Sequence, residues 1–123
     1  MGLSTHVLDT MHGCPAAGMA VKFYETSPNS EGGFDKTTLI KSLTLNADGR
    51  NPDGLLFDHD KLKVGTYRLV FDVASYFKSL GVSLPVPNFL NVVSLDFGIA
   101  HAEEHYHVPL LVSPWSYSTY RGS

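Results

Sequence analysis

Hydrophobic and polar positions alternate with a period of two along much of the chain. The alternation is clearest in residues 66–73, 93–99 and 106–112, where apolar side chains fall on one face of an extended segment. Shorter candidate strands lie at residues 5–8, 20–26, 39–45, 55–57 and 115–120. About eight strands separated by turn signals predict an all-β fold, an antiparallel sandwich or barrel.

One segment departs from this period and predicts a short helix near residues 73–80. Apolar residues recur there at intervals of three and four, at Val73, Tyr76, Phe77 and Leu80, which puts them on one stripe of a helix. Asp72 or Ser75 is expected to cap its start, and Gly81 to follow its end.

Composition narrows the class of protein. Hydrophobic residues make up 43% of the 123 residues and charged residues 17%, so we expect one folded domain over residues 1–123 rather than a disordered chain. Nine Lys and Arg against 12 Asp and Glu give a net charge of -3, which argues against a nucleic-acid partner. No apolar run long enough to span a membrane and no signal peptide are visible, so we expect a cytoplasmic protein without a membrane partner.

Two polar stretches, residues 27–36 and 46–54, predict loops. The first is expected to be a flexible hairpin tip. The second carries Arg50, flanked by Asp48 and Gly49 on one side and Asn51 on the other. Arg50 is either a solvated turn residue or a fixed cation that orients an anionic or carbonyl-rich small molecule.

Histidines offer the richest candidate chemistry. His105 and His107 lie two residues apart in a predicted strand and therefore on the same face. They are either solvated side chains or two ligands of a zinc ion whose third ligand is His101, Glu103 or His6.

Cysteine and nucleotide chemistry receive little support. The only cysteine, Cys14, excludes an internal disulfide, and its one suggestive neighbour is His12. We expect a structural role for this thiol. The chain contains no Gly-x-Gly-x-x-Gly, Walker-type or Gly-x-Ser-x-Gly motif, so nucleotide cofactors and an α/β-hydrolase nucleophile are not indicated.

Both ends of the chain carry more specific motifs. Near the start, Thr5-His6-Val7-Leu8-Asp9 is followed by Gly13-Cys14-Pro15-Ala16; near the end, residues 105–111 precede Ser113-Pro114, residues 116–119 and Tyr120-Arg121-Gly122-Ser123. Together these segments resemble the transthyretin-like family. The last four residues are similar to the C-terminal signature of the family's enzymatic branch, which hydrolyses 5-hydroxyisourate.

The resemblance implies a fold, an assembly and a reaction. The expected fold is a two-sheet β-sandwich with one short helix, assembled as a homotetramer, a dimer of dimers with sites at the dimer–dimer interface. The expected reaction adds water to the six-membered ring of 5-hydroxyisourate on the route from urate to allantoin, with no metal or other cofactor. The alternatives are a non-catalytic carrier of small ligands on the same fold and a zinc hydrolase using His105 and His107.

The resemblance also implies roles for particular residues. It assigns catalytic roles to His6, Arg50 and His107, and substrate binding to the tail residues Tyr120, Arg121, Gly122 and Ser123. A neutral imidazole suits a general base near pH 7, and a nearby guanidinium disfavours its protonated form. We therefore expect one histidine to activate water, the other to orient it or protonate the leaving nitrogen, and Arg50 to stabilise the oxyanion.

Overall fold

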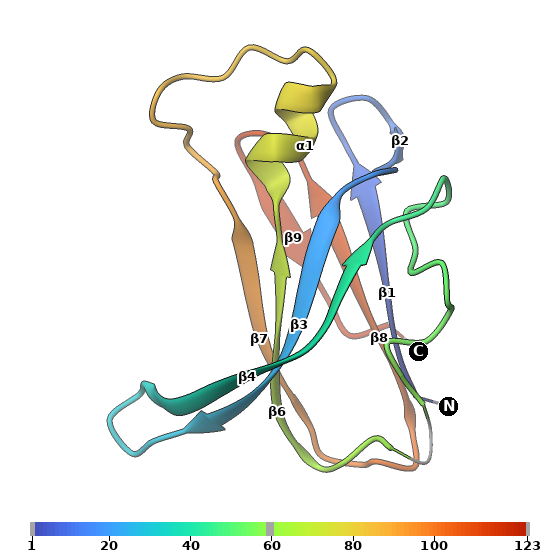
Figure 1. Ribbon diagram of the computed structural model, residues 1–123, viewed down its shortest axis with the longest axis vertical. Coiled ribbons are helices and arrows are strands. Elements are labelled where there is room, and N and C mark those ends of the chain that lie inside the picture. The colour runs from blue at the N-terminus through green and yellow to red at the C-terminus, as the bar shows by residue number, and fades with distance from the viewer. Residues whose placement is uncertain (1, 59–60, 123) are drawn as a thin grey trace.

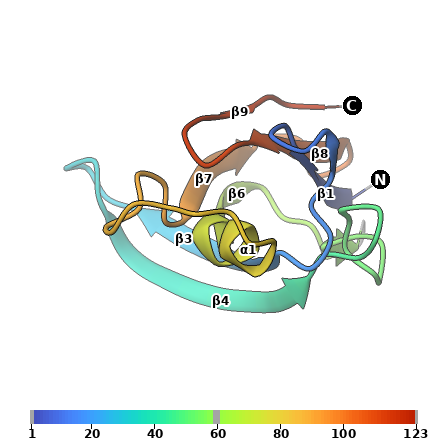
Figure 2. The ribbon, with the colours of Figure 1, turned by 90° about the horizontal axis from the view of Figure 1, so that it is seen from above.

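The computed structural model describes residues 2–58 and 61–122 and forms a sandwich of two β-sheets (Figure 1). One sheet has the order β2 (Cys14–Pro15), β1 (Gly2–Asp9), β8 (His105–Val112) and β9 (Tyr117–Thr119), and β5 (Phe57–Asp58) also pairs with β1. The other has the order β4 (Phe34–Thr44), β3 (Ala20–Pro28), β6 (Gly65–Phe71) and β7 (Val93–Ile99). Seen from above, the two sheets form separate layers (Figure 2). The predicted two-sheet sandwich is confirmed.

One pairing differs from the antiparallel sheet that the sequence pattern predicts. β1 and β8 run parallel over their whole length, from Gly2 opposite His105 to Asp9 opposite Val112. The alternation of side chains fixes which face of each strand is buried, but it carries no information about the direction of the neighbouring strand. The pairing brings residues a hundred positions apart in sequence side by side, and the candidate site lies on these two strands.

The predicted flexible loop at residues 27–36 is wrong in extent. β3 continues to Pro28 and β4 begins at Phe34, so that only residues 29–33 form the tip. The side-chain oxygen of Asn29 accepts hydrogen bonds from the backbone N–H groups of Glu31 and Gly33, both at 3.0 Å. A local hydrogen bond of this kind closes a turn tightly enough for both strands to extend into a polar segment.

The inward faces of the two sheets meet in an apolar core. The fully buried rings of Phe23 and Tyr67 stack with centroids 5.5 Å apart, and Phe57 contacts Tyr67 edge-on. The Tyr67 hydroxyl donates a hydrogen bond to the backbone carbonyl of Lys63 at 2.8 Å, so the one polar atom of this ring is satisfied. Burial of each such ring contributes about 2–3 kcal/mol.

The predicted helix is α1 (Val73–Ser79), and its boundaries agree with the sequence pattern to within one residue. The Asp72 carboxylate caps the start by accepting from the Ser75 backbone N–H, and Gly81 follows the end with φ +83°. Val73, Tyr76 and Phe77 of the apolar stripe are buried, whereas Leu80, which caps the end of the helix, is half exposed. Within residues 2–58 and 61–122, no helix is long and apolar enough to cross a bilayer.

Candidate functional site

Four polar side chains gather on the outer face of the sheet where β1 meets β8. Strand alternation turns Leu3 and Val7 into the core and leaves Ser4 and His6 on the outer face, half-buried. On β8 the same alternation leaves His105 and His107 half-buried and facing outward. The parallel register then sets Ser4 directly beside His107.

Two of the three predicted catalytic residues, His6 and His107, lie on this face. The rings of His6 and His107 lie 6.5 Å apart between centroids and are inclined by 30°. The structure therefore brings together two imidazoles that are a hundred residues apart in the chain.

Arg50 reaches the same face from the loop between β4 and β5. Its backbone forms an isolated antiparallel bridge with His6. Asn46 holds the loop in shape. Its side-chain oxygen accepts hydrogen bonds from the backbone N–H groups of Asp48 at 2.9 Å and Arg50 at 3.1 Å. Its backbone N–H donates to the Arg50 carbonyl at 2.9 Å. An exposed arginine is thus held on an ordered turn rather than on a mobile loop.

Gly49 allows this turn to approach β1 closely. It has φ +72°, and a Cβ placed there would lie 2.6 Å from the Val7 carbonyl oxygen. The Gly49 carbonyl accepts a hydrogen bond from the Val7 N–H at 3.0 Å. Only glycine combines that backbone conformation with that contact, so Gly49 places Arg50 beside His6.

Burial and charge both favour the neutral form of the two histidines. Partial burial lowers the pKa of His6, the Arg50 charge lowers it further, and a backbone hydrogen bond and the charge of Asp48 act in the opposite direction without reversing the shift. Burial likewise lowers the pKa of His107, with further contributions from Arg50, His6 and His105. Both rings are therefore predominantly neutral at pH 7 and able to accept a proton.

The tail after β9 divides between two faces of the sheet. Tyr120 turns to the outer face, where it lines a hollow of about 210 Å³ together with His6, Leu8 and Leu111. The Gly122 N–H donates to the His107 carbonyl at 2.7 Å, so the tail runs antiparallel beside β8 at His107. Ser123, the last of the predicted substrate-binding residues, lies outside the described residues.

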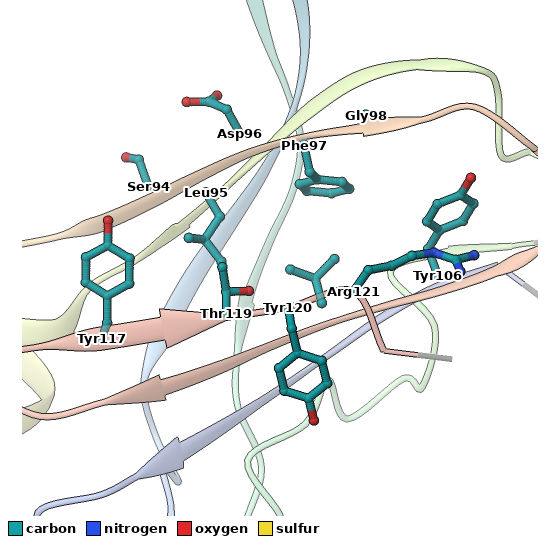
Figure 3. A pocket seen from close by; sticks show the side chains of 11 residues that line it. Ser94, Leu95, Asp96, Phe97, Gly98, Tyr106, Tyr117, Thr119, Tyr120 and Arg121 are labelled. Atoms are coloured by element: carbon teal, nitrogen blue, oxygen red, sulfur yellow. The ribbon is translucent and has the colours of Figure 1, made fainter.

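Arg121 points the other way. Its guanidinium lies 4.4 Å from the centroid of the Tyr106 ring and donates to Glu104 at 2.9 Å. Tyr106 points to the inner face of β8, whereas His107, the next residue, points to the outer face. Both Tyr120 and Arg121 border a cavity of about 510 Å³ between β7 and β9. Figure 3 shows the Arg121 side chain extending to Tyr106, whereas the Tyr120 ring points away from Tyr106. The Arg121 side chain is therefore directed away from the face that carries the histidines.

Ser4 is a site residue that sequence reasoning missed. Its hydroxyl oxygen lies 2.8 Å from Nδ1 of His107 and 3.2 Å from Nε2 of His105. The available signal was its position two residues before His6, and therefore on the same strand face. That signal becomes informative only once β1 and β8 are known to be neighbours.

The residues around Cys14 form a buried polar network. The fully buried Asp9 carboxylate accepts hydrogen bonds from the Tyr76 hydroxyl at 2.7 Å and from the His12 backbone N–H at 3.0 Å, with Nδ1 of His12 at 2.6 Å. Burial alone would raise the pKa of Asp9, but the bonds from His12 and Tyr76 outweigh it and lower this pKa. His12 is thus paired with Asp9, while Cys14 is exposed and not in a disulfide.

In the part of the chain that the structure describes, no third zinc ligand converges on His105 and His107. Among the described residues, the side chains close enough to share one ion are those of His101, Glu103 and Glu104, all exposed. Glu104 is already paired with Arg121. His105 and His107 each face the Ser4 hydroxyl instead.

These features define a class: a small two-sheet β-sandwich with a histidine and arginine site on the outer face of one sheet. The sequence profile of the HIUase/Transthyretin family matches residues 3–122. The chain belongs to the HIUase/transthyretin family.

Curated relatives agree over nearly the full chain. The 5-hydroxyisourate hydrolase 2 of Rhizobium meliloti (strain 1021) is 52% identical over 121 residues, 98% of this chain and 95% of that protein. The 5-hydroxyisourate hydrolase of Pseudomonas aeruginosa is 49% identical, covering 98% of this chain and 90% of that protein.

Solved structures with similar folds include both enzymes and carriers. An (S)-allantoin synthase crystal structure is 43% identical with TM-score 0.88, and the match covers 99% of this chain but only 43% of that one. Sea bream transthyretin, crystallised with thyroxine, is 31% identical with TM-score 0.78, over 99% of this chain and 95% of that one.

Proposed function

We propose that this chain hydrolyses 5-hydroxyisourate, adding water to the amide of its six-membered ring to give 2-oxo-4-hydroxy-4-carboxy-5-ureidoimidazoline in urate degradation. The observation that carries the proposal is the convergence of His6, Arg50 and His107, from three distant segments, on one sheet face. The curated relatives named 5-hydroxyisourate hydrolase, at about half identity over the full chain, support it.

In the proposed mechanism, one of the two neutral histidines takes a proton from water as the water oxygen attacks the ring carbonyl. The lowered pKa values of His6 and His107 support this role, because a base must be unprotonated at working pH. Arg50 holds the oxygens of the substrate and stabilises the oxyanion of the tetrahedral species. Cleavage of the C–N bond then returns the proton to the departing nitrogen.

We also propose that the tail contributes to substrate binding through Tyr120 and Gly122. Tyr120 shares a hollow with His6, and the Gly122 backbone bonds to His107. The side chain of Arg121 is committed to Glu104 and Tyr106. A role for Arg121 in holding the tail in place is therefore better supported than direct contact with substrate.

The assay generates 5-hydroxyisourate with urate oxidase and follows its ultraviolet absorbance with and without catalytic amounts of this protein. We expect His6→Ala and His107→Ala each to lower kcat about 100-fold or more, because general acid–base groups contribute about 10²–10⁴. Arg50→Glu should cause a similar loss. The exposed His101 provides a matched control, and His101→Ala should retain full activity.

A chelator tests the absence of a cofactor. We propose a reaction that uses only protein side chains, so the rate in excess EDTA should equal the untreated rate. A loss of activity that zinc restores would favour the zinc hydrolase instead.

A small-ligand carrier is the second candidate, because the fold is similar to sea bream transthyretin solved with thyroxine. It predicts saturable binding of a small aromatic ligand and no acceleration of substrate decay. A folded wild-type protein that binds thyroxine but does not accelerate the decay would select the carrier over the enzyme.

We propose that the protein assembles as a homotetramer, a dimer of dimers. In the described part of the chain, β7 and β9 are edge strands, as are β2 and β4, and each pairs on one side only; the edges at β7 and β9 could take a second copy. Exposed aromatic side chains lie nearby, with Trp115 58% and Tyr117 46% accessible. Light scattering should give about 54 kDa, four times the chain mass of 13.5 kDa. A cytoplasmic location is proposed as well, and cell fractionation tests it.

A further inference from the structure

The Ser4 hydroxyl lies between two imidazole rings. Its oxygen is 2.8 Å from Nδ1 of His107 and 3.2 Å from Nε2 of His105, and all three side chains are partly buried. His105 and His107 alternate on β8 with Tyr106 turned inward between them, so Ser4 on the adjacent strand faces both. The three groups form a continuous row on the outer face of the sheet.

A serine hydroxyl has one proton and can donate it to only one of the two rings. If it donates to His105, it must accept the Nδ1 proton of His107. If it donates to His107, it must accept the Nε2 proton of His105. The two hydrogen bonds therefore couple the tautomers of the two histidines, and the row exists in one of two states.

The environment of His107 distinguishes these states. Nδ1 faces Ser4, and the Gly122 backbone packs against the Cβ–Cγ–Cδ2 edge of the ring. Nε2 is therefore the nitrogen left for reactants. A base must present an unprotonated nitrogen, so a working His107 carries its proton on Nδ1.

We propose that Ser4 is a positioning residue: its hydroxyl accepts the Nδ1 proton of His107 and donates its own proton to Nε2 of His105, leaving Nε2 of His107 free as a base. This inference rests on the proposed hydrolysis and assigns the base to His107. His105 sets the direction of the Ser4 proton, and it acts through Ser4 rather than on substrate.

The row also stabilises the charge that forms during turnover. When Nε2 of His107 takes a proton from water, its Nδ1–H bond to Ser4 becomes charge-assisted and strengthens. The bond from Ser4 to His105 is polarised in the same direction. The charges of Arg50, His6 and His105 each oppose a positive charge on His107, so the hydrogen bond from Ser4 acts against them.

The test compares Ser4→Ala, Ser4→Thr and His105→Ala with wild type, using Ser42→Ala as the control because Ser42 is exposed on β4 in the other sheet. We expect Ser4→Ala to lower kcat about tenfold, the effect of one lost hydrogen bond, with KM little changed. Ser4→Thr keeps the hydroxyl and should restore most of this loss. His105→Ala should lower kcat by a smaller factor, and Ser42→Ala should have no effect.

Nitrogen-15 NMR of histidine-labelled protein gives a readout independent of activity. His107 should show a single tautomer protonated at Nδ1 in the wild type and a mixture in Ser4→Ala. A His107 protonated at Nε2 in the wild type would overturn the proposal, as would an unchanged kcat in a folded Ser4→Ala protein. If the wild type does not hydrolyse 5-hydroxyisourate, the proposed function fails, and the tautomer spectrum alone decides the arrangement of Ser4, His105 and His107.

Discussion

Gly122 offers a sharp test of how the tail and His107 share one site. A Cβ added at Gly122 would lie 2.9 Å from Cδ2 of His107, 3.1 Å from its Cβ and 3.3 Å from its Cγ. Carbon atoms in ordinary contact are about 3.5–4.0 Å apart. Gly122→Ala therefore forces either the His107 ring or the tail to move by about 0.6 Å or more.

The tail has little freedom to move on its own. The Gly122 N–H is bonded to the His107 carbonyl at 2.7 Å, and the neighbouring Arg121 is held by Glu104 and by the Tyr106 ring. A misplacement of about 1 Å in a reacting group costs about 100-fold in rate, so we expect kcat for 5-hydroxyisourate to fall about 10- to 100-fold. The stability loss should be about 1–3 kcal/mol, because Gly122 is buried and the added methyl group overpacks its contact with His107.

The measurement is the steady-state rate of 5-hydroxyisourate decay, with urea unfolding as the check on stability. Gly65→Ala is the matched control, since Gly65 is exposed, has no left-handed φ and leaves open space around an added Cβ. This control should remain within about twofold of wild type. A fully active and stable Gly122→Ala protein would refute the reasoning, because it would show that the tail and the His107 ring do not constrain each other.

The charges of Arg50 and Asp9 lead to two further predictions. Arg50→Gln removes one of the causes that lower the pKa of His6 and His107, so the acid limb of kcat/KM should move to higher pH, and a limb that stays in place would contradict this. Asp9→Asn should destabilise the protein by about 2 kcal/mol in urea unfolding, because hydrogen bonds to a buried charge are lost. Because the pKa of Asp9 is lower in the folded state, its ionised carboxylate adds to the free energy of unfolding above pH ~4, and this stabilisation is lost as the pH falls through the folded pKa. An Asp9→Asn protein that loses stability in acid as steeply as wild type would argue against this role of Asp9.

The sequence pattern predicts individual elements well. Alternation identifies β6, β7 and β8 because each has one buried face, and the three-four spacing identifies α1 because its stripe packs on the core. The extension of β3 and β4 into residues 27–36 could not be predicted, since β4 is exposed along most of its length and has no apolar face to signal a strand. The two-residue strands β2 and β5 are too short for any periodic signal.

The candidate site residues could be predicted from the sequence motifs at the two ends of the chain, but not from the alternation of hydrophobic and polar positions. Spacing puts His105 and His107 on one face, yet it does not reveal that Ser4 lies between them, because that contact depends on the parallel pairing of β1 with β8. The direction of Arg121 was missed for a similar reason. A tail residue next to Tyr120 has no buried partner visible in the sequence, and its contacts with Glu104 and Tyr106 exist only once β8 is in place.

The parallel alignment of β1 with β8 also has a consequence for folding kinetics. Ser4 and His105 are 101 residues apart in sequence, so closing the loop between them costs about 4 kcal/mol of chain entropy if nothing between has folded. The β3–β4 hairpin and the β6–β7 pair involve shorter separations and should form first, with β1 and β8 docking late. Substitutions along the β1–β8 seam should then speed unfolding and leave the folding rate nearly unchanged. The face that carries the candidate site would be the last part of the sandwich to assemble and the first to open.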